Sequence, residues 1–578
     1  MISPGGTRRS LARVARMALY ALPLAFLAVF LFYPLLSILG VSLAPQGRLD
    51  LSALGELVRN GYYRRTIWFT TWQAVLSTAL TLALGLPGAY VFARYAFPGK
   101  QLLRALTTIP FVLPTVVVAS AFRALLGPQG RLNLALMETL GLERPPLNLQ
   151  HTLAIILIAH VFYNYTVVLR LVSGFWANLD PRLEEAGAVL GAGRWRLFRE
   201  VTLPLLTPAV AAAALLVFVF CFTSFGVVLL LGGPRFATVE VEIYYQTVSF
   251  LNLPMAAALS LVQILFTTVL IWLYTRLQAR TTVPLNLRPR SATTRPMQSW
   301  RARLMVAFNV GLIVLMLALP LLALVERSLA TADGYSLAYY RELSVNRRGS
   351  VLFVPPLEAV RNSVSFALVT VALALTLGAL AAQILGSQGG ARARAEGGVA
   401  TLVRGLRASL DPIFMLPLGV SAVTLGLGYI VALDTPPLNL RTSAWLTPLA
   451  HTLVALPFVV RTLLPALRGM NPRWREAAAV LGAPPWRVWL EVDLAIIGRA
   501  MLVAAAFAFT VSMGEFGATS LIARPDRPTM PVAISRFLSQ PGALNQGQAL
   551  AMSALLMGVC MVAFMAIERL RVGEIGEF

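Results

Sequence analysis

The sequence contains few of the residues from which catalytic and metal sites are usually built. Its 578 residues include two cysteines, three histidines and one lysine, and only 13% of them are charged. Cys221 and Cys560 both lie in apolar runs, which excludes a disulfide framework. The histidines lack the spacing of a zinc site, and no pairing of a nucleophile with a base stands out. We therefore expect no catalytic residue and no metal in this chain.

A phosphate-binding loop for ATP is also missing. Such a loop needs Gly-Lys followed by Ser or Thr, so that the chain wraps the phosphates and holds Mg²⁺. The one lysine, Lys100, is followed by Gln101. The chain is therefore not expected to be an ATPase, and no cofactor is predicted in it.

Long apolar runs are abundant. Hydrophobic residues make up 57% of the chain, and the mean hydropathy is +0.73. A run of about 20 apolar residues crosses a bilayer core of roughly 30 Å as a helix. This composition predicts an all-α polytopic membrane protein rather than a large soluble helical protein. We expect twelve spans, near residues 17–43, 67–93, 105–126, 152–176, 205–232, 255–275, 304–325, 362–385, 412–433, 444–467, 496–521 and 546–567.

The distribution of charge predicts how the chain lies in the membrane. A net charge of +23 would suggest a nucleic-acid partner in a soluble protein, but membrane proteins keep basic residues on the cytoplasmic side. The N-terminal tail, the even-numbered loops and the C-terminal tail hold 28 basic residues, and the odd-numbered loops hold 16. We therefore expect a multi-pass protein of the cytoplasmic (inner) membrane, with both termini in the cytoplasm, lipid around it and no nucleic-acid partner.

The chain contains an internal duplication. The stretch PPLNL occurs at residues 145–149 and again at 436–440, a shift of 291 residues. Two parallel six-helix repeats follow, and the interface between them is the natural pathway for a solute. We expect a first half at 1–280, a basic linker at 281–303 and a second half at 304–578. With the same shift, identical residues correspond at further positions: His160 and His451, Arg170 and Arg461, Pro181-Arg182 and Pro472-Arg473, Trp195-Arg196 and Trp486-Arg487, and Phe225-Gly226 and Phe516-Gly517.

Each half carries a polar segment on the predicted cytoplasmic side, near 180–204 and near 471–495. In the first, Asp180 suits a helix N-cap, Pro181 suits the first helical position, and Gly191 suits the left-handed residue after the helix. The second segment repeats this order with Asn471, Pro472 and Gly482.

Two readings of these segments are possible. One is an interfacial amphipathic helix anchored at the headgroups by Trp195 and Trp486. The other is a short rigid helix that docks on another protein. Two copies in the same register favour docking.

The two segments resemble a known motif. EAGAVLG from Glu185 and EAAAVLG from Glu476 are similar to the EAA loop of binding-protein-dependent ABC importer permeases. The family pattern continues to a Val-x-Leu-Pro, which the first copy has, whereas the second has Ala495 in place of the proline. The second loop is therefore expected to dock at a different angle. The resemblance implies that six residues couple the chain to an ATPase: Glu185, Ala186, Gly191, Glu476, Ala477 and Gly482.

The resemblance extends over nearly the whole chain and is strongest to fused permeases of thiamine and ferric-iron importers. Residues 97–114, 157–172 and 220–246 are similar to the thiamine type, whereas the Gly-Glu-Phe-Gly within 512–522 also occurs in molybdate-type permeases. It implies the type I ABC importer permease fold, two separate ATPase subunits that use ATP and Mg²⁺, and an extracytoplasmic solute-binding protein. Thiamine is the favoured solute, a ferric ion is the alternative, and an oxyanion comes after both.

One carboxylate lies inside a predicted span. Glu515 occupies the repeat position of Ser224, and both precede a phenylalanine, Phe516 and Phe225. Glu515, Ser224, Phe225 and Phe516 are the candidate residues of the substrate pathway. Glu515 would either attract a cation there or bond to neighbouring helices as a structural group, and the sequence does not separate the two. The arginines inside spans are interpreted as snorkelling residues (Arg123 and Arg499) or helix-interface residues (Arg170 and Arg461).

Two other transporter classes are weighed against this prediction. A secondary transporter should show clusters of ionisable groups or broken helices within the membrane, and of these the sequence offers Glu515 alone. A passive channel should lack a duplicated docking loop.

Overall fold

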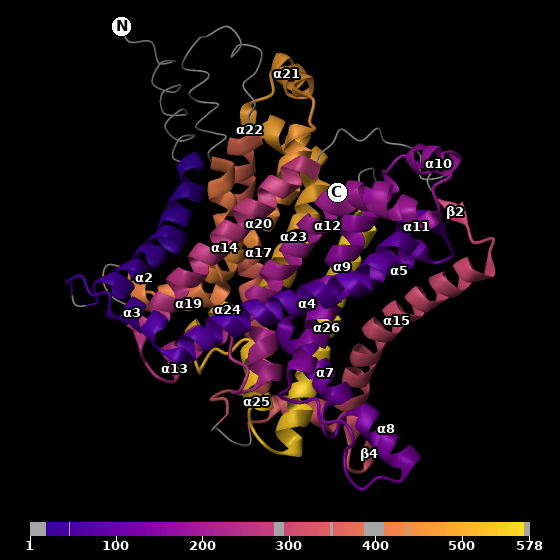
Figure 1. Ribbon diagram of the computed structural model, residues 1–578. Helices are drawn as coiled ribbons and strands as arrows, with labels where there is room; N and C mark the ends of the chain where they lie inside the picture. Colours follow the sequence, from indigo (N-terminus) through magenta and orange to yellow (C-terminus); the bar gives the residue numbers. More distant parts are fainter. Residues whose placement is uncertain are drawn as a thin grey trace, which may run out of the picture. The chain divides into compact units, whose positions relative to one another are not determined.

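The computed structural model describes residues 19–571 except 46, 282–293, 347–350, 387–409, 435 and 437. Nearly all regular structure in this part of the chain is helical (Figure 1). Strand β1 (Tyr95–Ala96) pairs in parallel with β2 (Arg295–Pro296), and β3 (Ala330–Thr331) pairs antiparallel with β4 (Gly334–Tyr335). The predicted all-α membrane class is confirmed. Most of the predicted linker 281–303 lies outside the described residues.

Ten helices in the described residues are long and apolar enough to cross a membrane. Each overlaps one of the predicted spans. They are Leu19–Leu43, Gly61–Arg94 (α4), Leu153–Ala177 (α9), Trp195–Phe222, Leu253–Leu277, Trp300–Leu329 (α15), Pro356–Gly386 (α17), Leu446–Arg468 (α20), Trp486–Gly514 and Ala543–Ile567.

The third predicted span of each half is not a continuous helix. Residues 105–126 fall into α5 (Lys100–Leu106), α6 (Ile109–Val112) and α7 (Thr115–Leu126). Prolines near these breaks remove backbone donors and end the helices, and twelve residues of α7 rise only about 18 Å. In the second half, Leu410–Gly419 and α19 (Ala422–Ala432) meet at 97°. The described residues thus hold ten candidate spans, or eleven if this bent pair is one span, and the predicted count of twelve is not confirmed.

The chain packs as two compact units that differ from the sequence halves. Unit 1 comprises Met1–Leu49, Val345–Ala533 and Gly558–Phe578, and unit 2 comprises Asp50–Ser344 and Ile534–Met557. The first helix of the chain therefore belongs to the unit that holds most of the second half. In return α15, the first helix of the second half, belongs to unit 2.

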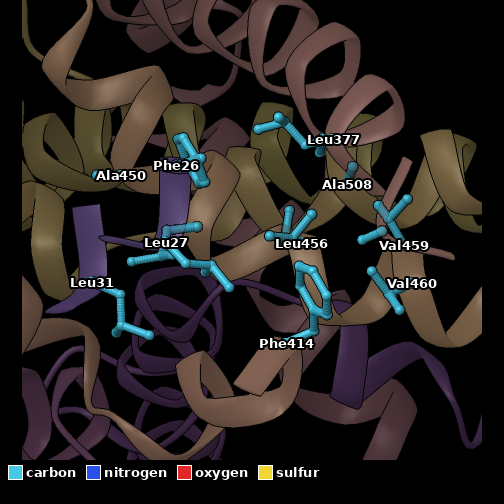
Figure 2. Packing of buried hydrophobic residues seen from close by; sticks show 14 of the residues in the cluster. Phe26, Leu27, Leu31, Leu377, Phe414, Ala450, Leu456, Val459, Val460 and Ala508 are labelled. Atoms are coloured by element: carbon cyan, nitrogen blue, oxygen red, sulfur yellow. The ribbon is translucent and has the colours of Figure 1, made fainter. Parts of the chain in front are cut away.

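In unit 1, buried apolar side chains hold the first helix of the chain against helices of the second half. Phe26, Leu27 and Leu31 from the first helix are buried in one cluster with Phe414 and with Leu456 of α20 (Figure 2). Further along this helix, α2 (Tyr33–Leu43) packs on α19. Gly428 permits the close approach, because a Cβ there would lie 2.9 Å from the Cβ of Pro34.

In unit 2 the corresponding packing joins α4, α9 and α12 (Leu203–Phe222). Their buried residues include Ala74 and Ala89 of α4, Val168 of α9 and Val217 of α12. Helix α15, which comes much later in the sequence of unit 2, packs against α7.

The duplicated sequence produces duplicated contacts within the units. Gly85 of α4 lies against Val168 of α9 in unit 2, and in unit 1 Gly378 of α17 lies against Val459, which is the repeat equivalent of Val168. A side chain at either glycine would overlap the valine, so each helix pair crosses closely at this point.

A side-chain hydroxyl of α4 in unit 2 and one of α17 in unit 1 also accept equivalent hydrogen bonds from the backbone of another segment. The Thr70 Oγ1 accepts a hydrogen bond from the Val239 N–H at 3.0 Å in unit 2. In unit 1 the Ser363 Oγ accepts one at 2.8 Å from the N–H of Met530, 291 residues after Val239. The two halves therefore share one scaffold.

Candidate functional site

The first polar segment forms the predicted capped helix, α10 (Pro181–Val189). The Asp180 side chain accepts a hydrogen bond from the Arg182 N–H at 3.0 Å. At the other end, Gly191 has φ +83°, its N–H donates to the Ala188 carbonyl at 3.0 Å, and the next N–H donates to the Gly187 carbonyl at 3.1 Å. This pair of bonds is a Schellman motif, which needs a left-handed residue and favours glycine.

The second polar segment forms the same structure, α21 (Pro472–Val480). Asn471 accepts from the Arg473 N–H at 3.1 Å. Gly482 also has φ +83° and donates to the Ala479 carbonyl at 3.0 Å, while the following N–H donates to the Ala478 carbonyl at 3.0 Å. The local backbone of the two copies is therefore alike.

A short π-helix joins each segment to the next span. It is η2 (Phe198–Thr202) before α12 and η8 (Trp489–Asp493) before α23 (Leu494–Gly514). The turn is present in the second copy although Ala495 replaces the proline, because alanine adopts the helical backbone at least as readily. The absence of this proline thus changes no backbone element of the second copy.

Both short helices expose an apolar pair at their C-terminal ends. Val189 and Leu190 are each 87% exposed, and so are their equivalents Val480 and Leu481. Exposed apolar side chains grouped in this way mark interaction surfaces. Within unit 2, α10 lies at the opposite end from α8 (Arg131–Leu140) and β4 (Figure 1). Ala186, Glu476 and Ala477 are also exposed, whereas the side chain of Glu185 lies outside the described part of the structure.

The Glu515 carboxylate lies at a break between two helices of unit 1. It follows α23, is only 6% exposed, and precedes α24 (Gly517–Ile522). One oxygen accepts from the Ala518 N–H at 2.8 Å, and the other accepts from the Thr519 N–H at 2.9 Å and from the Thr519 hydroxyl. These N–H groups have no carbonyl partner within the helix, so the carboxylate caps α24.

His451 of α20 braces the same break. Its Nε2 lies 3.4 Å from the Glu515 Oε2 and 2.8 Å from the Thr519 Oγ1, and its Nδ1 lies 2.7 Å from the Ser512 Oγ. The imidazole therefore joins α20 to the last turn of α23 and to the first turn of α24.

In unit 2, His160 of α9 lies at the equivalent position and also contacts the residue at a helix break. Its Nδ1 lies 2.9 Å from the Ser77 Oγ, and its Nε2 lies 2.9 Å from the Ser224 Oγ, beyond the end of α12. Ser224 and Glu515 are thus equivalent in position and each meets its own histidine, while Phe225 and Phe516 are both buried. In the sequence, the equivalence of the two histidines in the repeat was the signal of a shared polar role.

Comparison with known proteins identifies the family. Residues 85–283 match the family described as binding-protein-dependent transport system inner membrane component. The thiamine transport system permease protein of Escherichia coli (strain K12) is 28% identical over 529 residues, 89% of this chain and 90% of that protein. These matches support a fused binding-protein-dependent ABC permease. A Brucella abortus (strain 2308) relative, also a thiamine transport system permease protein, is 29% identical over 514 residues, 88% of each chain.

Other matches span different shares of the permease. A probable ABC transporter permease protein of Sinorhizobium fredii is 26% identical over 571 residues, 95% of each chain. A chain of a bacterial ABC transporter that imports alginate has 18% sequence identity and a TM-score of 0.39, and the match covers 48% of the permease and 100% of that chain. The permease is a multi-pass inner-membrane subunit of an ABC importer, as its sequence relatives indicate.

Broken helices are present in this permease, so this feature does not distinguish it from a secondary transporter. The sequence suggested no broken helix, yet breaks occur before Ser224, at Glu515 and at the 97° bend before α19. The expectation of continuous helices is therefore wrong. Its physical cause is that Gly and Pro within apolar runs lower the hydropathy little, while Gly destabilises a helix and Pro removes a backbone donor.

Three of the four arginines inside predicted spans make protein contacts, and the fourth, Arg499, is exposed. Arg170 donates to the Thr108 hydroxyl, and the Arg461 Nε lies 3.2 Å from the Met415 Sδ, each contact joining two segments of one unit. Arg123, expected to snorkel, donates to the Leu538 carbonyl at 3.0 Å, at the end of α25 (Met530–Leu538). A cation at a helix C-terminus is favoured by the helix dipole.

We predict that Glu515→Gln lowers the maximal uptake rate but leaves the permease folded and assembled with its partners. Glutamine keeps one acceptor oxygen and presents an NH₂ group to the donors of Thr519, and losing such a cap costs about 1 kcal/mol. Uptake kinetics and thermal stability of the purified permease test this, with Glu358→Gln as the exposed control. A raised KM with an unchanged maximal rate would instead indicate that Glu515 contacts the solute.

Proposed function

We propose that the permease moves thiamine from an extracytoplasmic binding protein into the cytoplasm. The observation that carries this is the match, over about nine-tenths of both chains, to thiamine transport permeases of Escherichia coli and Brucella abortus. A ferric ion remains the alternative from the sequence resemblance, and an oxyanion comes after it.

Two ATPase subunits supply the energy in this proposal, one seated on α10 and one on α21. The support is that each helix is capped, rigid at its glycine turn, and exposes an apolar pair. Glu185, Ala186 and Gly191, and then Glu476, Ala477 and Gly482, are the proposed contact residues. ATP and Mg²⁺ bind to the partner subunits.

The docking helices face the cytoplasm in this proposal, and the binding protein docks on the opposite side. The support is the excess of basic residues, 28 against 16, on the side that includes both polar segments and both termini. Within unit 2, α8 and β4 lie at the end away from α10 and are available to the binding protein (Figure 1).

The mechanism we infer is alternating access. Closure of the two ATPase subunits on ATP moves α10 and α21. Each movement passes through a π-helix into α12 or α23, and each of these leads to a helix break braced by a histidine. Helix breaks are places where packed elements take up a change in angle. The side chains at 224 and 515 are thus placed to respond when the halves rock.

The function is tested by reconstitution. Proteoliposomes that contain the permease, its partner ATPase and its binding protein are expected to accumulate radiolabelled thiamine only when ATP is present. Ferric ion and molybdate are offered as competing solutes. Uptake of one of these without uptake of thiamine would contradict the proposed substrate, and uptake without ATP would contradict the class.

Docking is tested by Gly191→Arg, which is expected to reduce co-purification of the ATPase and to uncouple uptake. A residue with a side chain in the left-handed conformation costs roughly 1–2 kcal/mol, so the turn after α10 would be distorted. Gly193→Arg is the matched control, because Gly193 is exposed and has space for a side chain. Glu185→Lys should act in the same direction as Gly191→Arg. Undiminished ATPase binding and transport in both variants would rule out docking at α10.

A further inference from the structure

A pair of short strands brings two basic segments of unit 2 together. Strand β1 follows α4 directly, and β2 lies within the predicted linker between the sequence halves. Their register places Tyr95 opposite Arg295 and Ala96 opposite Pro296. Helix α5 begins four residues after β1, and α15 begins four residues after β2 (Figure 1). The starts of these two helices are therefore held close to one another.

A backbone carbonyl of each segment holds a basic side chain. The Lys100 Nζ donates to the Tyr95 carbonyl at 2.9 Å, and the Arg303 Nε donates to the Met297 carbonyl at 3.2 Å. Met297 lies two residues beyond the partner of Tyr95, so the spacing of paired strands places the two carbonyls within roughly 10 Å. The exposed Arg303 keeps four further N–H donors. Two positive charges at this separation repel one another, and an anion between them is attracted by both.

The sequence around the strands supplies further positive charge and no negative charge. Arg301 is exposed, with its guanidinium 5.7 Å from the centroid of the Trp300 ring, and Arg104 lies in α5. Neither residues 57–137 nor residues 243–325 contain Asp or Glu. The complementary charge for this surface must therefore come from outside these two segments.

An exposed apolar stripe runs along α15 from the same place. Trp300, Leu304 and Phe308 are 69%, 61% and 68% exposed and follow at intervals of four residues, so they share one face of the helix. The helix packs on α7, and the buried residues of its first half are Ala302, Val306, Asn309 and Ile313. From Trp300 to Phe308 the helix rises about 12 Å, which takes the stripe from the headgroup level, where tryptophan is common, into the hydrocarbon.

We propose that Lys100, Arg301 and Arg303 bind the phosphate of an anionic phospholipid, whose acyl chain lies along Trp300, Leu304 and Phe308. A soluble phosphate would match the basic groups and leave the stripe uncovered. A zwitterionic lipid would match the stripe and bring no net charge to the basic groups. The site depends neither on the proposed solute nor on the proposed docking of an ATPase.

Binding is measured by the fluorescence of Trp300. The permease is placed in phosphatidylcholine nanodiscs with a graded fraction of phosphatidylglycerol brominated on its acyl chains, and the quenching of Trp300 is the difference between each protein and its Trp300→Phe counterpart. Brominated phosphatidylglycerol is expected to quench Trp300 at a lower fraction than brominated phosphatidylcholine. Arg301→Gln should raise the fraction needed about fivefold, and Arg301→Gln with Arg303→Gln about 25-fold, since each basic residue near an anionic surface contributes to that extent. Arg301→Lys should stay close to the wild type.

The matched control is Arg499→Gln, which removes the same charge from another exposed arginine. It should leave the quenching of Trp300 unchanged. An equal loss in Arg499→Gln and Arg301→Gln would overturn the proposal, because general attraction to the membrane would then explain the effect. Equal quenching of the wild type by both brominated lipids would overturn it as well. Relief of the quenching by inorganic phosphate, at constant ionic strength, would assign the basic groups to a soluble anion instead.

Thermal unfolding of the detergent-solubilised permease separates lipid binding from folding. Phosphatidylglycerol is expected to raise the melting temperature of the wild type more than phosphatidylcholine does, because a ligand of the folded state stabilises it. Arg301→Gln, a surface change, should melt like the wild type without added lipid and should lose most of the additional rise. A full additional rise in the variant that lacks both Arg301 and Arg303 would overturn the proposal.

Discussion

In the core of a bilayer no water is available to the backbone N–H and C=O groups that a broken helix releases. Several helices of this permease are broken, and buried polar side chains meet at two of the breaks. Glu515 caps α24, His451 joins both sides of that break to α20, and His160 joins Ser224 to Ser77 of α4. Breaks satisfied in this way are stable and can still change angle, because a side-chain hydrogen bond tolerates more reorientation than a continuous helical ladder. The alternating access proposed above requires such breaks within a fixed apolar scaffold.

The two halves show how a duplicated backbone can carry different side-chain chemistry. The caps, glycine turns and π-helices of the polar segments match, as do the contacts at Gly85 and Gly378. Differences appear where side chains meet side chains, as at Ser224 and Glu515 beside their histidines. Backbone geometry is retained because each turn needs its own residue type, whereas a contact between two side chains can change in a pair of substitutions without disturbing the turn.

The exchange of first helices places segments of both sequence halves in each compact unit, which the sequence repeats do not suggest. Phe26, Leu27 and Leu31 are buried among residues of the second half, and α15 packs on α7 of the first half. Separating the chain at residues 281–303 would therefore expose apolar surface of both units. The fused polypeptide keeps these exchanged helices at the high local concentration that a covalent link provides.

The sequence by itself determined the membrane class, the duplication and the two capped polar helices, because hydropathy, repeat spacing and capping residues act over short distances along the chain. It also singled out Glu515 and left its role open. The exchange of first helices, the interruption at residues 105–126, and the bracing by His160 and His451 were decided by the tertiary structure. These features depend on which helices lie side by side, and an apolar helix face carries little information about its partner, since many similar faces would pack equally well.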